Sequence, residues 1–197
     1  MTAPPFNPGP KRERGFTMLE VLVTIVILAM GLLGVAGLQA RMQVAEMESY
    51  QRAQAIVLLG DMVTRINANR KNATSYVTAT PQGTGNAVAD CSGLTDRAAL
   101  DLCAWNNALL GANETTGTQT IGAMIGARGC IANTVATMPR QFVVAVVWQG
   151  LSPTVAPGAT TCGQGSYGND AARRAIVANV TIGCLQNDPA TGLCTTP

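Results

Sequence analysis

The chain has 197 residues, enough for one domain of ordinary size and an anchoring segment. Apolar residues make up 47% and charged residues 12%, and the net charge of +2 is too small for nucleic-acid binding through a basic field. The chain contains no histidine, which excludes Ser-His-Asp and Cys-His catalysis, imidazole metal ligands and histidine pH switches. We therefore expect no catalytic residue, no metal, no cofactor and no nucleic-acid partner.

Residues 1–15 combine four prolines with a basic cluster and are not expected to pack. The cluster consists of Lys11, Arg12 and Arg14, and it directly precedes a long apolar run. Positive charges stay on the cytoplasmic side of a membrane, so the cluster predicts that the rest of the chain lies on the far, periplasmic side. We expect residues 1–15 to form a cytoplasmic leader.

A transmembrane helix is expected over residues 16–40. No residue from Val21 to Ala40 is charged, and about 20 apolar residues are enough for a helix to cross a bilayer. Glu20 lies near the start of this segment, and a lone acidic side chain costs about 2.5–3.5 kcal/mol or more at the bilayer centre. A partner outside the segment is therefore expected for Glu20.

The helix is expected to continue over residues 41–72 as an amphipathic segment, because no proline interrupts the chain from Phe16 to Thr80. Spacings of three and four predict a buried stripe made of Met42, Ala45, Ser49, Ala53, Ile56, Leu59, Val63 and Ile66. Three glycines punctuate the membrane segment at Gly31, Gly34 and Gly37. They favour either close approach of a neighbouring helix or local unwinding, and both alternatives remain open.

Residues 73–197 are expected to form a periplasmic globular domain that contains disulfides. The six cysteines all lie there: Cys91, Cys103, Cys130, Cys162, Cys184 and Cys194. An even number of cysteines in an exported domain predicts three disulfides, with fifteen possible pairings. A metal site is disfavoured because the chain has neither a CxxC pair nor a histidine.

One helix and three strands are expected within this domain. Thr95 or Asp96 caps a helix that ends near Leu110, and Asp101 is expected on the surface of that helix. Alternating apolar residues predict strands over Cys130–Val135, Arg140–Gln149 and Arg174–Leu185. The second of these strands is apolar on both faces, which predicts a strand covered on both sides. The fold class is α+β, with the long N-terminal helix packed on a small antiparallel β-sheet.

The residues Gly15-Phe16-Thr17-Met18-Leu19-Glu20, followed by the uncharged apolar run, resemble the class III signal of type IV prepilins. A secretory signal peptide or a plain signal anchor explains neither the Gly-Phe junction nor the acid. The resemblance implies that a prepilin peptidase cleaves between Gly15 and Phe16 and methylates the new amine of Phe16. It also implies that Glu20 pairs with this amine, which stays cationic, on a neighbouring subunit.

Within the type IV pilin superfamily the sequence is most similar to the type IV pilus modification proteins, the PilV family. The similarity lies in Thr-Met-Leu-Glu-Val-Leu-Val at residues 17–23, in residues 29–34, and in shorter matches around Trp105, Cys130 and Trp148. It implies a pilin-like lollipop fold and a non-catalytic minor pilin that helps to initiate type IV pilus assembly in or near the pilus tip.

The same resemblance implies the partners and the location. The partners are the prepilin peptidase, other minor pilins and the major pilin through the N-terminal helix, a tip adhesin and the inner-membrane assembly platform. The chain is expected as a single-pass inner-membrane protein with a cytoplasmic N-terminus, and later as part of the pilus.

Three other functions are alternatives to this one. A minor pseudopilin of a type II secretion system would share the leader and the anchor, and a DNA-uptake pseudopilin would favour an exposed cationic loop. A membrane-anchored periplasmic enzyme would need a constellation of reactive groups. Lys71 is the only lysine beyond the leader, and Asp96 and Asp101 are better explained as first-turn and surface residues.

Overall fold

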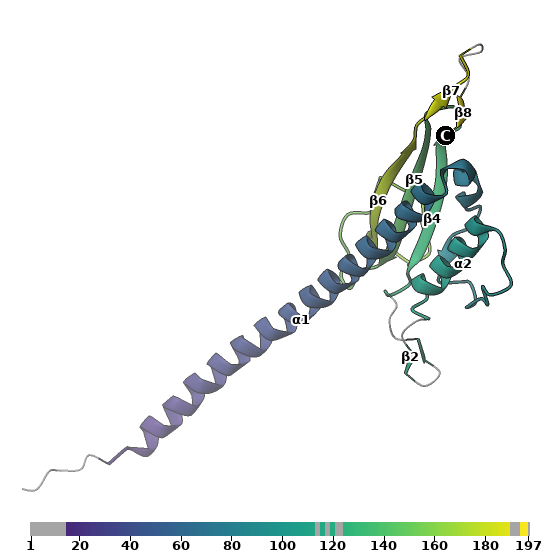
Figure 1. Ribbon diagram of the computed structural model, residues 1–197. Helices are drawn as coiled ribbons and strands as arrows, with labels where there is room; N and C mark the ends of the chain where they lie inside the picture. The colour runs from purple at the N-terminus through teal and green to yellow at the C-terminus, as the bar shows by residue number, and fades with distance from the viewer. Residues whose placement is uncertain (1–14, 113–114, 117–118, 121–123, 190–193, 197) are drawn as a thin grey trace, which may run out of the picture. The chain divides into compact units, whose positions relative to one another are not determined.

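The computed structural model describes residues 15–112, 115–116, 119–120, 124–189 and 194–196 (Figure 1). The basic cluster of Lys11, Arg12 and Arg14 lies outside the described residues. The chain divides into two compact units, Met1–Val44 and Ala45–Pro197, and each is described by itself. Helix α1 (Met18–Ala68) supplies residues to both units.

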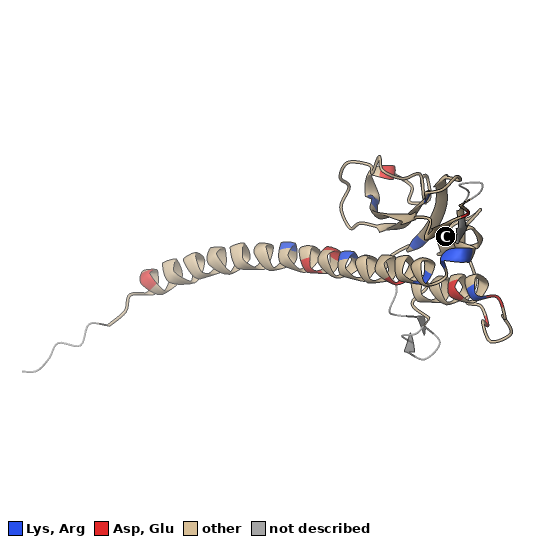
Figure 2. Cartoon of the chain, turned by 45° about the horizontal axis from the view of Figure 1, so that its top comes forward, with Lys and Arg blue, Asp and Glu red and all other residues tan. Residues whose placement is uncertain are grey.

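Helix α1 is 51 residues long and ends at Ala68, four residues before the end of the predicted segment 41–72. It contains no proline, so nothing in the sequence removes a backbone donor or forces a kink. Figure 2 shows a long stretch without charged side chains in its first half, bounded on one side by the acidic residue near its start. From residue 15 to residue 44 every side chain is exposed.

Three shorter helices follow in the described part of the second unit, and the last of them is the 3₁₀ helix η2 (Asp170–Ala172). The 3₁₀ helix η1 (Arg70–Tyr76) continues closely after α1, and α2 (Arg97–Leu109) lies further along the chain. Asp96 caps α2, because its carboxylate accepts a hydrogen bond of 2.8 Å from the backbone N–H of Ala99. Gly111, with a φ of 69°, ends the helical path just beyond α2. The predicted cap and the predicted end of this helix are confirmed.

A four-stranded antiparallel sheet has the order β1-β4-β5-β6. Its strands are β1 (Gln82–Gly83), β4 (Arg128–Val135), β5 (Arg140–Gln149) and β6 (Arg173–Ile182). Strand β5 has the predicted bounds, β4 begins two residues earlier than predicted, and β6 ends three residues earlier. The short strand β1 was not predicted. Two further hairpins pair β2 (Thr115–Thr116) with β3 (Gln119–Thr120) and β7 (Gln186–Asn187) with β8 (Cys194–Thr196).

Strand β5 is covered on both faces, as its sequence predicted. One face contributes Phe142, Val144, Val146 and Trp148 to the main core, together with residues of α1 and α2. The other face places Ala145 and Val147 in a second cluster with Cys162 and Tyr167. Trp105 of α2 packs so closely over Gly129 of β4 that a Cβ atom there would lie within 2.7 Å of its ring carbon Cζ2. The absence of a side chain at Gly129 thus creates the space that Trp105 fills.

The stripe of α1 that faces this core differs from the predicted one. The buried residues of the helix are Gln51, Ala55, Met62 and Ile66. Leu59 and Val63 are partly buried, as expected, but Ala53 and Ile56 are exposed. Apolar residues occur on more than one face of this helix, so their spacing alone does not select the face that the sheet covers. The prediction was therefore wrong for the first half of the stripe.

Three disulfides pair all six cysteines: Cys91–Cys103, Cys130–Cys162 and Cys184–Cys194. The second of these bonds joins β4 to the long connection between β5 and β6.

Arg173 orders the same connection: its side chain is 2% exposed and its guanidinium donates to both carboxylate oxygens of Asp170, at 2.7 and 2.8 Å. It also donates to three backbone carbonyls of the connection, those of Pro157, Thr160 and Cys162. This buried arginine was not foreseen from the sequence.

Candidate assembly site

The N-terminal motif forms the start of α1. Gly15 and Phe16 precede the helix, and the Oγ1 atom of Thr17 accepts a hydrogen bond of 3.2 Å from the backbone N–H of Glu20. A threonine three residues before a glutamate is the sequence pattern of a capping box, and the structure contains the threonine half of it. The cap places Glu20 in the first turn of α1, where the helix dipole favours a negative charge. The sequence contained this signal for Thr17, but the prediction did not use it.

The Glu20 side chain is exposed, and within the described part of the chain it makes no hydrogen bond or ion pair. Phe16 is also exposed, at 82%. The structure places both groups at the beginning of the helix and leaves both accessible to another molecule. Their assembly roles stay predictions, because a single chain cannot contain a contact between subunits.

The apolar surface of the first unit extends along the whole helix segment after Glu20. Among the described residues, α1 is the one helix that is long and apolar enough to cross a membrane by length and composition, and its apolar window is not buried. Gly31, Gly34 and Gly37 lie in this segment, and a Cβ atom built on any of them would meet nothing within 4 Å. An exposed apolar helix of this length suggests membrane anchoring.

In the second unit the end of α1 is held by a buried carboxylate. Asp101 of α2 is 0% exposed, so the predicted surface position was wrong. Its Oδ1 atom accepts a hydrogen bond of 2.8 Å from Arg65 of α1, and its Oδ2 atom accepts one of 2.6 Å from the Tyr76 hydroxyl and one of 3.2 Å from Arg97. One carboxylate therefore connects α1, η1 and α2. The sequence shows the aspartate but not the two arginines and the tyrosine that make its burial possible.

The charge state of Asp101 follows from these contacts. Burial by itself raises the pKa of a carboxylic acid, but the hydrogen bonds from Tyr76 and Arg65 and the charges of Arg97 and Arg65 outweigh it and lower the pKa of Asp101. Burial and the bond to Asp101 raise the pKa of Tyr76 to about 12. Asp101 is thus ionised and Tyr76 is neutral at pH 7. The charged carboxylate can therefore accept hydrogen bonds from the Arg65 guanidinium and from the Tyr76 hydroxyl at the same time.

A second polar contact joins the same two helices. The indole N–H of Trp105, in α2, donates a hydrogen bond of 3.0 Å to the backbone carbonyl of Leu58 in α1. Trp105 is 0% exposed and belongs to the main core. The contacts of Asp101 and Trp105 together keep the last turns of α1 on the globular domain.

The described residues contain no group of three or more His, Cys, Asp or Glu side chains that could hold a metal ion. The six cysteines were candidates for disulfides, and the structure places each of them in a disulfide. The cysteines of the chain therefore serve as disulfide cross-links.

Comparisons with known proteins match two family models. Residues 10–36 match the prokaryotic N-terminal methylation motif, and residues 37–108 match type IV pilin Tt1218. The first match contains Gly15, Phe16 and Glu20, and the second extends through the rest of α1 into α2. No curated protein and no solved structure matches the chain.

Proposed function

We propose, since this chain belongs to the type IV pilin superfamily, that it is a non-catalytic minor pilin that helps to initiate type IV pilus assembly in or near the pilus tip. The chain has the corresponding α+β pilin-like fold, a long N-terminal apolar helix packed on a small antiparallel sheet. The observation that carries the proposal is the coincidence of the methylation motif with a helix whose apolar first half is exposed throughout. The type IV pilin family is structural and non-catalytic.

The N-terminal motif implies processing by a prepilin peptidase and assembly with other pilins. In the proposed mechanism the peptidase cuts between Gly15 and Phe16 and methylates the Phe16 amine. The Thr17 cap holds Glu20 in the first turn of the helix, only four residues from this amine. The Glu20 carboxylate then pairs with the amine of a neighbouring subunit at the same depth in the membrane. An unpaired Glu20 carboxylate in the membrane is unfavourable for the single chain, so formation of the ion pair between subunits favours assembly.

The apolar helix suggests membrane anchoring, and we propose the rest of the topology from the sequence. Residues 1–15 form the cleaved cytoplasmic leader, residues 16–40 cross the inner membrane, and residues 41–72 continue the helix into the periplasm. Residues 73–197 form the globular domain there. The proposed partners are the peptidase, other minor pilins, the major pilin, a tip adhesin and the assembly platform, and membership of the PilV family is part of this proposal.

Two measurements test the proposal. Mass analysis of the N-terminus of the purified protein should find N-methylated Phe16, and a retained Met1 would exclude prepilin processing. Deletion of the gene should reduce the number of surface pili, and re-expression should restore it. Normal piliation combined with a defect in protein secretion would instead assign the chain to a type II secretion system as a minor pseudopilin.

A further inference from the structure

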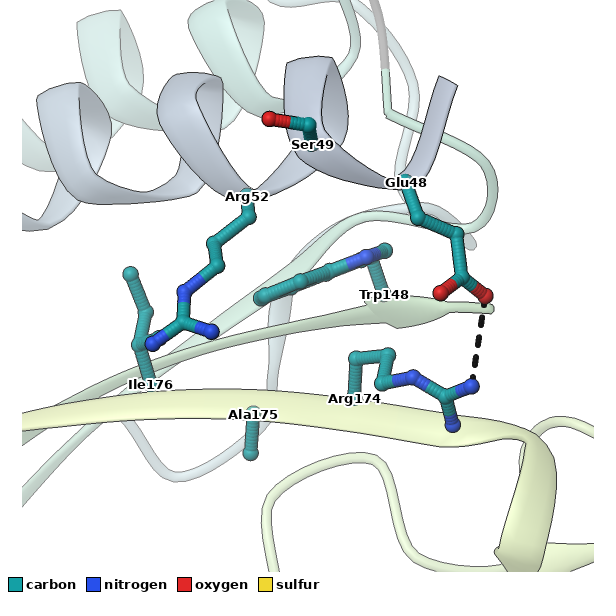
Figure 3. A pocket seen from close by; sticks show the side chains of 7 residues that line it. All are labelled: Glu48, Ser49, Arg52, Trp148, Arg174, Ala175 and Ile176. Atoms are coloured by element: carbon teal, nitrogen blue, oxygen red, sulfur yellow. Dashed lines mark hydrogen bonds and ion pairs between the residues drawn. The ribbon is translucent and has the colours of Figure 1, made fainter. Parts of the chain in front are cut away.

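A pocket of about 370 Å³ lies between α1, β5 and β6 in the second unit (Figure 3). The residues that decide its chemistry are Glu48 and Arg52 of α1, Trp148 of β5, and Arg174 and Ile176 of β6. Two arginines and one glutamate give this lining a net charge of +1. The pocket shares no residue with the N-terminal motif, and no part of the assembly mechanism above uses it.

The acidic side chain of the pocket is already engaged. The Oε1 atom of Glu48 accepts a hydrogen bond of 3.3 Å from Arg174 and one of 3.1 Å from the backbone N–H of Leu151. Arg174 also donates to the carbonyl oxygens of Ala171 and Ser152. Glu48 and Arg174 therefore neutralise each other and are fixed in place by backbone groups.

Arg52 has no such partner among the described residues. It follows Glu48 by four residues, a spacing at which a glutamate and an arginine on a helix commonly pair. Figure 3 shows instead that the Arg52 side chain extends away from Glu48 and toward Ile176, while Glu48 and Arg174 meet on the other side of the Trp148 indole. Among the described residues Arg52 makes no hydrogen bond or ion pair.

Trp148 adds a second donor without an acceptor. Its side chain is 4% exposed, and its indole N–H has no hydrogen-bond partner within the described part of the chain. Donors therefore exceed acceptors around the pocket. Trp148 and Ile176 line the pocket together with the exposed Arg52 side chain, and apolar walls beside a charge strengthen an ion pair relative to one in open solvent.

We propose that this pocket binds a carboxylate side chain of a neighbouring pilin subunit and that Arg52 is its ion-pair partner. The inference rests on the proposed function, since it requires other pilin subunits. A guanidinium binds a carboxylate through two parallel hydrogen bonds, so one unpaired arginine is sufficient for recognition. Arg52 lies in α1 a few residues after the fully exposed segment 15–44. Beyond Arg52 the helix still exposes apolar side chains, those of Ile56 and Val57. A neighbouring subunit that packs along these residues would therefore reach the pocket.

Charge reversal in the full-length chain tests the proposal. Arg52→Glu and the control Lys71→Glu are each expressed in cells that lack the native copy. Lys71 is exposed, makes no hydrogen bond or ion pair with a described residue and does not line the pocket, so the control changes the net charge equally at another place. The ratio of the chain in sheared pili to the chain in membranes should fall about tenfold or more for Arg52→Glu only. Equal ratios in the two variants overturn the proposal.

A rescue experiment identifies the carboxylate. In the Arg52→Glu strain, exposed Asp and Glu residues of the other pilin subunits are changed to Arg one at a time, and one change should restore incorporation. Failure of every change to restore it overturns the ion pair. Where Arg52→Glu lowers the amount of chain in the membrane, the neutral variant Arg52→Gln is compared with Lys71→Gln under the same criteria. Normal incorporation of both wild type and Arg52→Glu would refute the proposal that the pocket binds a carboxylate, and it would leave the proposed function intact. Absence of the wild-type chain from pili would refute the proposed function.

Discussion

The Oδ1 atom of Asp101 lies 2.8 Å from the Nη1 atom of Arg65, so a buried carboxylate of α2 receives a guanidinium from the last turn of α1. The Tyr76 hydroxyl and the Arg97 guanidinium complete the set of donors. Because these groups come from three separate helices, the contact fixes where the amphipathic half of α1 ends on the globular domain. It explains how an acidic side chain can be buried in a small core.

Replacement of this carboxylate should weaken the fold. Asp101→Asn removes the charge that Arg65 and Arg97 contact and leaves an amide N–H₂ group facing their N–H groups. We expect a loss of roughly 2–4 kcal/mol in the free energy of unfolding. Urea unfolding of the full-length chain in detergent, followed by the fluorescence of the buried Trp105 and Trp148, measures it. The control Glu46→Gln changes an exposed carboxylate, and equal stability of the two variants would contradict the role of Asp101.

The Asp101 carboxylate should make the free energy of unfolding depend on pH in the acidic range. The pKa of Asp101 is lower in the folded state than its ordinary value of 3.8, so the folded state binds fewer protons in this range. The stabilisation is complete above pH 3.8 and is lost as the pH falls through the lowered pKa. Wild type should therefore lose more stability than Asp101→Asn between neutral pH and about pH 2.5. Parallel decreases in both proteins would show that other groups cause the acid sensitivity.

The close contact between Gly129 and Trp105 should not tolerate a methyl group. Gly129→Ala would place Cβ within 2.7 Å of the ring carbon Cζ2 of Trp105, a side chain that is 0% exposed and belongs to the main core. We expect a destabilisation of about 1–3 kcal/mol, measured by the same urea unfolding. Gly158→Ala is the matched control, because a Cβ atom there meets nothing within 4 Å. A similar effect at both positions would contradict the packing argument.

Removal of an unpaired buried amide should stabilise the chain. Gln51 of α1 is 2% exposed, and neither its Nε2 nor its Oε1 atom has a hydrogen-bond partner among the described residues. Gln51→Met keeps a similar length and removes both polar atoms, so the free energy of unfolding should rise by about 1–3 kcal/mol. Gln54→Met serves as the comparison, since the Gln54 amide already bonds to the Tyr50 hydroxyl. A loss of stability in Gln51→Met would disprove the assignment of an unpaired amide.

The role of Glu20 can be separated from membrane insertion. Glu20→Ala removes an acidic group from an apolar segment, so insertion should proceed at least as well as in wild type. Incorporation into filaments should fall about tenfold or more, because the amine of the neighbouring subunit loses its proposed partner. Quantitative comparison of the chain in membranes and in sheared filaments measures both effects. Normal recovery of the variant in filaments would refute the ion pair.

Local patterns predicted the elements whose geometry depends on neighbours in the sequence. The alternation of apolar residues gave the bounds of β5 and its two covered faces, and the Asp96 carboxylate marked the start of α2. The cap arises from a contact within three residues. The strand pairs with more distant segments, but its side chains alternate between two faces, and the sequence shows that both faces are apolar. The absence of proline likewise predicted that α1 is a single long helix.

Contacts between distant segments could not be predicted in the same way. Asp101 was expected at the surface, because its donors Arg65 and Tyr76 lie 36 and 25 residues away in the chain. The buried face of α1 was placed partly wrongly, since several of its faces carry apolar residues and only the position of the sheet selects one. The choice among fifteen disulfide pairings also required the distances between cysteines that the fold alone sets.

The sequence by itself determined the α+β class, the long apolar helix and the motif of Gly15, Phe16 and Glu20. These features follow from the composition, from the periodicity of apolar residues and from the identity of adjacent residues, all of which can be read without knowledge of distant contacts. The tertiary structure alone decided the burial of Asp101, the pairing of the cysteines and the pocket in which Arg52 pairs with no described residue. Each of these depends on groups far apart in the chain, which become neighbours only when the apolar faces of the helices and the sheet are buried together.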